Sequence, residues 1–129
     1  MLVVVKKTLR VLLAALMILA GVSHFRTPHP FVRIVPSYLP APLALVYISG
    51  LFECLGGLGL LIPRLRKAAG LGLIALYFAV FPANVHMAMN NLSLGDTPVE
   101  PWLLWLRLPL QAVLIAWAYW VSQERATTR

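Results

Sequence analysis

The stretch Leu43–Ile62, LALVYISGLFECLGGLGLLI, decides the fold. Glu53 is its only charged residue, and Pro42 and Pro63 bracket it, as suits the edges of a helix. Its length matches the roughly 20 residues that a helix needs to cross about 30 Å of hydrocarbon. The stretch therefore predicts a membrane-spanning helix.

Three further apolar runs have the same character. Pro82 and Pro109 lie inside two of them, where we expect kinks whose freed carbonyls are satisfied by neighbours or water. We therefore predict an all-α integral membrane protein, a single domain over 1–129 that forms an antiparallel four-helix transmembrane bundle. The predicted spans are about 8–25, 43–62, 68–91 and 102–121.

The composition is typical of a chain embedded in a lipid bilayer. Hydrophobic residues make up 60%, charged residues only 12%, and the mean hydropathy is +0.83. A soluble domain carries about a quarter charged residues. The net charge of +7 does not indicate nucleic-acid binding, because the basic residues form short clusters between apolar runs. The lipid bilayer is thus the expected partner.

These clusters also predict the orientation, because Lys and Arg accumulate on the cytoplasmic side. With four spans, eight of the eleven Lys and Arg residues share one side: Lys6, Lys7, Arg10, Arg64, Arg66, Lys67, Arg125 and Arg129. Both termini are therefore expected in the cytoplasm. A cleaved signal peptide also fits the basic start and short first run. Its removal would move Arg125 and Arg129 to the opposite side, so we expect the first run to be retained.

The proline-rich segment 26–42 is expected on the outer side. It is too proline-dense for a continuous helix, yet Phe31 and Ile34 are apolar. We expect this segment to lie in the outer interface as a cap. Trp102 and Trp105 suit an outer aromatic belt, and His24 is expected to be interfacial. The second outer segment is 92–101.

Polar residues inside the spans are the candidate site, because charges are costly in hydrocarbon and usually face the bundle interior. At about 1.5 Å per residue, Glu53 lies roughly 15 Å deep and Arg107 about 9 Å deep. Asn84 and His86 are about 200° apart on a helix, and we favour His86 as the inward one. The candidate ligand-binding residues in the outer half are Glu53, Asn84, His86, Arg107 and Gln111.

Two interpretations of this polar group stay open. In the structural one, a Glu53–Arg107 ion pair, completed by Gln111 and Asn84, holds the helices in register. In the functional one, the group forms a proton- or quinone-linked site. No residues stand at metal-ligand spacing, so no metal is expected.

Small residues predict where helices approach closely. They recur in the second span and along one face of the third: Gly50, Gly56, Gly57, Gly59, Ala68, Gly72, Ala75, Ala79 and Ala83. We expect all of them to be packing residues. Cys54 is the only cysteine and is expected to be an inert packing residue, because an intrachain disulfide is excluded.

Four blocks resemble the DoxX-like family of small membrane proteins: HFRTPHPF, the glycine-rich helix around Glu53, FPANVHM and LWLRLPLQ. The resemblance extends from about Leu13 to Ser122. It implies a multi-pass protein of the bacterial inner membrane that serves redox systems, some of them quinone-coupled, with a soluble or membrane redox partner. Other relatives resemble assembly factors. No catalytic set carries over, so enzymatic activity stays open.

The sequence thus favours a DoxX-like accessory subunit of a redox or detoxification system. A quinone-like lipid would bind in the outer half, where Arg107 and Gln111 orient a carbonyl and Glu53 or His86 handles protons. No other cofactor is expected. The alternative is a non-enzymatic membrane scaffold or assembly factor. A small-molecule permease is weaker, because four short spans enclose little lumen unless the chain forms a homo-oligomer.

Overall fold

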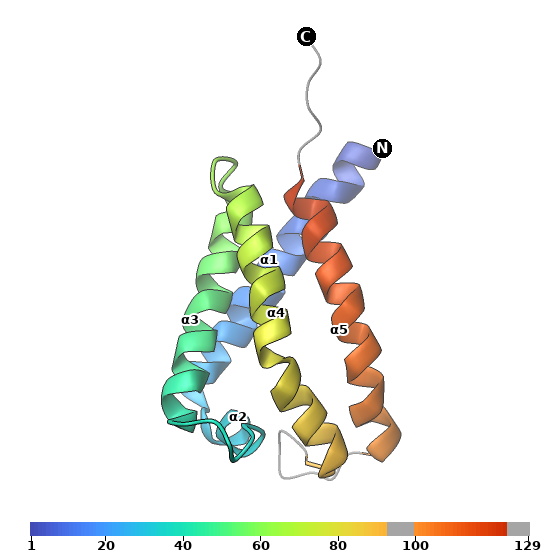
Figure 1. Ribbon diagram of the computed structural model, residues 1–129. Coiled ribbons are helices and arrows are strands. Elements are labelled where there is room, and N and C mark those ends of the chain that lie inside the picture. The colour runs from blue at the N-terminus through green and yellow to red at the C-terminus, as the bar shows by residue number, and fades with distance from the viewer. Residues whose placement is uncertain (93–99, 124–129) are drawn as a thin grey trace.

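The computed structural model describes residues 1–92 and 100–123, which are all-helical. Four long helices run in alternating directions, and a short helix lies across one end (Figure 1). The helices are α1 (Leu2–Arg26), α2 (His29–Arg33), α3 (Pro42–Leu61), α4 (Arg66–Met89) and α5 (Pro101–Ser122). The helical fold class predicted from the sequence is confirmed.

Helices α3, α4 and α5 cover three of the predicted spans to within a few residues. Each is long and apolar enough to cross a membrane, which indicates a membrane protein. Pro42 and Pro101 occupy the first turns of α3 and α5, where a missing N–H costs little. Helix α1, over the predicted span 8–25, is not one of these three.

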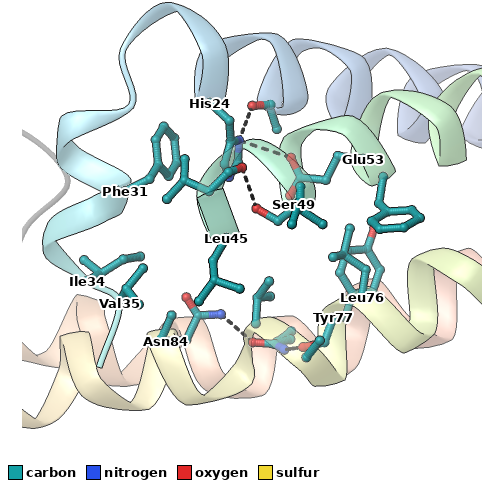
Figure 2. Close-up of a pocket in the computed structure, with 18 of the residues that line it drawn as sticks. His24, Phe31, Ile34, Val35, Leu45, Ser49, Glu53, Leu76, Tyr77 and Asn84 are labelled. Atoms are coloured by element: carbon teal, nitrogen blue, oxygen red, sulfur yellow. Dashed lines mark hydrogen bonds and ion pairs between the residues drawn. The ribbon is translucent and has the colours of Figure 1, made fainter. Parts of the chain in front are cut away.

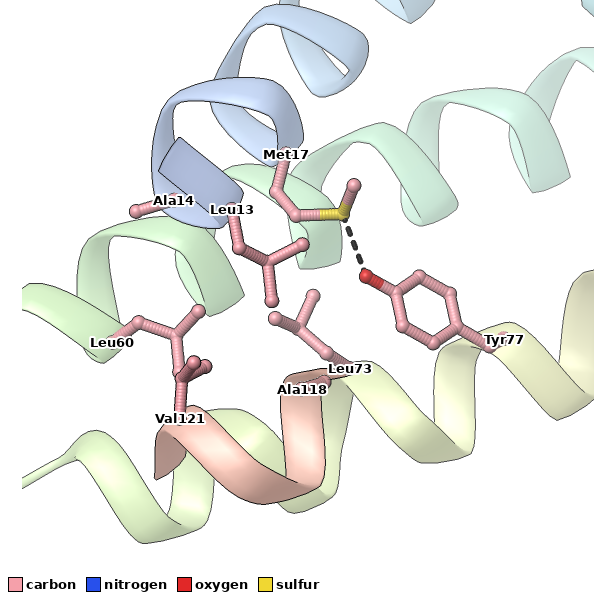
Figure 3. Close-up of a cluster of buried hydrophobic side chains, with 8 residues drawn as sticks. All are labelled: Leu13, Ala14, Met17, Leu60, Leu73, Tyr77, Ala118 and Val121. Atoms are coloured by element: carbon pink, nitrogen blue, oxygen red, sulfur yellow. Dashed lines mark hydrogen bonds between the residues drawn. The ribbon is translucent and has the colours of Figure 1, made fainter. Parts of the chain in front are cut away.

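One half of the bundle, at the end that holds the start of α1, is tightly packed. We call it the packed half. Leu13, Leu60 and Val121 are fully buried there (Figure 3). The complete cluster is Leu13, Ala14, Met17, Leu60, Leu73, Tyr77, Ala118 and Val121. All four long helices contribute, so this cluster is the apolar core of the fold.

Close backbone approach explains the packed half. A Cβ atom on Gly57 of α3 would lie 2.8 Å from the Ala14 carbonyl oxygen and 2.9 Å from Ile18 Cγ1 of α1. A Cβ on Gly70 of α4 would overlap the Ser122 side chain of α5. The predicted packing role of the α3 glycines is therefore confirmed.

The packing role predicted for the small face of α4 is wrong for most of its length. Gly72 has no atom within 4 Å of an added Cβ, and Ala68 and Ala75 are exposed. Helix α4 instead buries the face that carries Gly70 and Leu73. Spacing defines the faces of a helix, but the positions of the neighbouring helices decide which face is buried.

Helix α1 meets α5 at the same end, through hydrogen bonds to the last turn of α5. Arg10 Nε donates to the Val121 carbonyl at 2.8 Å, and Lys6 donates to the Gln123 carbonyl. The indole of Trp117 donates to the Leu9 carbonyl at 3.2 Å. Because the last carbonyls of a helix lack partners within it, Lys6 and Arg10 cap α5, whereas Trp117 joins α5 to the backbone of α1.

Candidate functional site

The other half, which we call the cavity half, surrounds a cavity of about 740 Å³. Ligand sites for small molecules commonly measure about 300–1,000 Å³. All four long helices line this cavity, and most of its lining is apolar. Phe52 and Leu110 line it and are also exposed, so the cavity is not sealed from its surroundings.

The segment between α1 and α3 covers one end of the cavity. Phe31, Val35 and Leu39 line the cavity, and Ile34 and Pro36 are buried against it (Figure 2). The segment contains only the short helix α2 and is otherwise non-helical, so the expected absence of a continuous helix is confirmed. The segment is thus a cap of the cavity, whereas its predicted position in the membrane interface stays a prediction.

His24 of α1 and Glu53 of α3 form one polar wall (Figure 2). His24 Nδ1 lies 3.4 Å from Glu53 Oε2 and 2.6 Å from the Ala20 carbonyl oxygen. A carbonyl only accepts, so Nδ1 carries the hydrogen and donates it to Ala20 over the shorter distance. Glu53 Oε2 is consequently buried without a hydrogen-bond partner.

The predicted ion pair between Glu53 and Arg107 is wrong. Within the described residues, Glu53 pairs with His24, a contact that is ionic only when His24 is protonated, and Arg107 makes neither an ion pair nor a hydrogen bond. Arg107 lines the cavity but is an exposed residue. The close approach of α1 to α3 at Gly50 brings His24 to the carboxylate first: a Cβ on Gly50 would lie 2.7 Å from His24 Cβ.

Asn84 of α4 and Gln111 of α5 form the opposite polar wall. Asn84 Nδ2 donates to Gln111 Oε1 at 2.5 Å, and Gln111 Nε2 donates to the Tyr77 carbonyl. Gln111 is buried, with 5% of its surface exposed. The amide chain joins α4 to α5 in the turn before Pro82. The carbonyl that Pro82 leaves without a helical donor is that of Phe78, so its expected satisfaction by neighbours or water stays a prediction.

His86 does not point into the cavity, so its choice over Asn84 as the inward residue is wrong. Asn84 lines the cavity, whereas His86 does not. The side chain of His86 instead pairs with its helical neighbour Asn90, with Nδ1 and Nδ2 3.2 Å apart. His86 shares its face with the small residues of α4, of which Ala79 and Ala83 line the cavity while Ala68, Gly72 and Ala75 are exposed.

His24 is the residue whose role the sequence understates. We expected it to be interfacial, but only 8% of it is exposed, and its ring stacks on Phe31 of the cap at a centroid distance of 4.0 Å. The signal available was the spacing of Gly50 and Glu53, which places the carboxylate one turn from the closest contact with α1. Trp102 and Trp105 are exposed near the start of α5.

Tyr77 and Met17 close the cavity toward the packed half. The Tyr77 hydroxyl donates to Met17 Sδ at 2.9 Å, and both residues line the cavity. Over the residues that the structure describes, no group of three or more His, Cys, Asp or Glu side chains could hold a metal ion. The site is thus an apolar chamber with one carboxylate–imidazole wall and one amide wall.

A comparison with known families finds a match over residues 13–122, to a family described as a domain of unknown function (DUF8561). No curated protein and no solved structure matches the chain. The match covers most of the sequence, including α3, α4, α5, the second half of α1 and both polar walls. The chain therefore belongs to this family, a domain of unknown function (DUF8561).

Proposed function

We propose that this protein binds an amphiphilic, quinone-like small molecule in its cavity and serves as an accessory subunit of a redox or detoxification system. The observation that supports the proposal most is the 740 Å³ apolar cavity with polar walls on opposite sides. Protein interiors are normally close-packed, so an apolar space of this size indicates an occupant. The DoxX-like resemblance supports the redox setting, in which a partner protein supplies the electron transfer.

The two polar walls suit the head of such a molecule. Asn84 offers an amide and Arg107 offers N–H donors at the cavity rim. Across the cavity, Glu53 has an oxygen without a hydrogen-bond partner among the described residues. A ring with oxygen atoms at opposite ends, as in a quinone or hydroquinone, meets both walls at once. The exposed lining residues give a hydrophobic tail a way out between the helices.

We further propose four spans, with both termini on the cytoplasmic side of a bacterial inner membrane. Helix α1 has 25 residues, and its outward side chains Leu12, Leu16 and Leu19 are exposed and apolar, as lipid contact requires. In a Cys54→Ala background, single cysteines in place of Tyr38 and Arg64 should be labelled from opposite sides of the membrane. Labelling from the same side would contradict four spans. Ser93 and Thr127, also suitable by sequence, lie outside the described residues.

The binding proposal is tested by native mass spectrometry of protein extracted gently from its own membrane, with analysis of the extracted lipids. We expect a stoichiometric quinone or similar isoprenoid. Ala83→Phe places a ring in the cavity and should abolish this adduct. Ala75→Phe, on the exposed face of the same helix, is the matched control and should retain it.

Phospholipid alone, with a co-purifying protein, would contradict the binding proposal. It would instead favour the scaffold or assembly factor, in which the polar walls only join helices. The amide chain from Asn84 through Gln111 to Tyr77 is the observation that fits this second function. An oligomer with a continuous pore would favour a permease.

A further inference from the structure

The carboxylate–imidazole wall, which holds Glu53, differs from the amide wall in how its donors and acceptors are paired. Ser49 Oγ donates to the Val46 carbonyl at 2.9 Å, and His24 Nδ1 donates to the Ala20 carbonyl. The Tyr77 hydroxyl donates to Met17. These three donor hydrogens are therefore directed to acceptors other than Glu53.

Glu53 Oε2 is the group left over on this wall. It is buried and has no hydrogen-bond partner, and the side chain as a whole is 13% exposed. A buried acceptor without a partner is costly and is usually satisfied by protein, water or ligand. The nearby Nδ1–H of His24, 3.4 Å away, is directed to the Ala20 carbonyl and cannot accept a hydrogen bond from Glu53. Glu53 thus lines the cavity with a carboxyl group whose Oε2 is buried and has no hydrogen-bond partner among the described residues.

We infer that Glu53 determines specificity: it selects ligands that carry a hydroxyl donor on an apolar body, such as alkylphenols and hydroquinones, over the same molecules without that hydrogen. The inference rests on the proposed binding function and narrows its ligand class. A hydroquinone head would donate to Glu53, whereas the corresponding quinone carbonyl would face an acceptor. The site therefore prefers the reduced form of a quinone-like ligand.

The test compares 4-decylphenol with its methyl ether, which lacks only the donor hydrogen and adds a methyl group. Binding of each radiolabelled compound is measured by equilibrium dialysis of nanodiscs that contain the protein, with empty nanodiscs as the background for lipid partitioning. We expect the phenol to bind about tenfold more tightly than the ether, as one additional hydrogen bond in a buried site provides.

Variants assign the preference to Glu53. Glu53→Leu should bring the affinity ratio of phenol to ether close to one, and the isosteric Glu53→Gln should lower it if the leucine variant fails to fold. Ser49→Ala is the matched control, because Ser49 lines the same wall but its hydroxyl is already bonded. Its ratio should equal that of the native protein.

The outcomes separate this inference from the binding proposal. Equal binding of phenol and ether by the native protein overturns the inference and leaves a ligand-binding cavity. A preference for the phenol that survives in both Glu53 variants overturns the role of Glu53. Binding of neither compound above the empty nanodiscs, while Ala83→Phe leaves the native adduct unchanged, overturns both proposals.

Discussion

The packed half and the cavity half use the same four helices in opposite ways. In the packed half, glycines bring α3 against α1 and α4 against α5, and Leu13 and Leu60 fill the centre. In the cavity half, α1 and α3 stay in contact at Gly21 and Gly50, but the space toward α4 and α5 is a cavity of about 740 Å³. Of the buried polar residues that the structure describes, His24 and Gln111 line this cavity, whereas Ser122 lies in the packed half.

The difference indicates which half provides stability and which provides function. Close packing of apolar side chains and backbones stabilises a fold, while a cavity forfeits such contacts. A protein retains a large cavity with unpaired polar groups at a cost in stability, and functional sites are where such costs are commonly found. We therefore expect substitutions in the packed half to act on folding and those in the cavity half to act on binding.

The largest effect is expected from Gly57→Leu in the packed half. The new side chain would meet the Ala14 carbonyl and Ile18 of α1, so overpacking should lower the free energy of unfolding by about 3 kcal/mol. Gly72→Leu is the control, because no atom lies within 4 Å of its added Cβ; its cost should be below about 0.5 kcal/mol. Equal losses in denaturant titrations of the two purified variants would contradict the packing difference.

A smaller effect is expected from Gln111→Leu, which removes the hydrogen bonds to Asn84 and to the Tyr77 carbonyl. Interhelical hydrogen bonds in membrane proteins contribute about 0.6 kcal/mol on average and at most about 1.7. We expect a loss of about 1 kcal/mol in the free energy of unfolding. A double-mutant cycle with Asn84→Leu should show coupling, whereas additive losses would contradict the amide chain.

The smallest effect on stability is expected from Glu53→Leu. Breaking a buried ion pair typically costs about 3–5 kcal/mol, but Glu53 has an unpartnered oxygen and only a long contact with His24. The variant should therefore be as stable as the native protein or more stable by up to about 1 kcal/mol. Adding Arg107→Leu should change little. A large loss of stability in Glu53→Leu that the added Arg107→Leu reverses would instead support a structural Glu53–Arg107 pair.

The sequence predicts the helices well and their mutual rotation poorly. Apolar runs and flanking prolines place α3, α4 and α5 to within a few residues, because hydrophobicity and the missing proline N–H act locally. Which side of α4 faces inward depends on its neighbours, so the choice of His86 over Asn84 failed.

The partner of Glu53 could not be predicted from depth alone either. Depth along the helices suggested that Glu53 pairs with Arg107. The close approach of α1 to α3 at Gly50 instead places His24 next to the Glu53 carboxylate. Four of the five candidate ligand-binding residues nevertheless line the cavity: Glu53, Asn84, Arg107 and Gln111. Rarity of polar residues in apolar helices is the signal that located them.

The most direct test of the difference between the two halves is a crystal structure of the protein purified from its own membrane without added quinone or phenol. We predict an elongated electron density between Glu53 and Asn84, with a tail that leaves past Phe52 or Leu110, and its absence in Ala83→Phe crystals. Closure of α4 and α5 onto α1 and α3, with no space left beside Glu53, would contradict it.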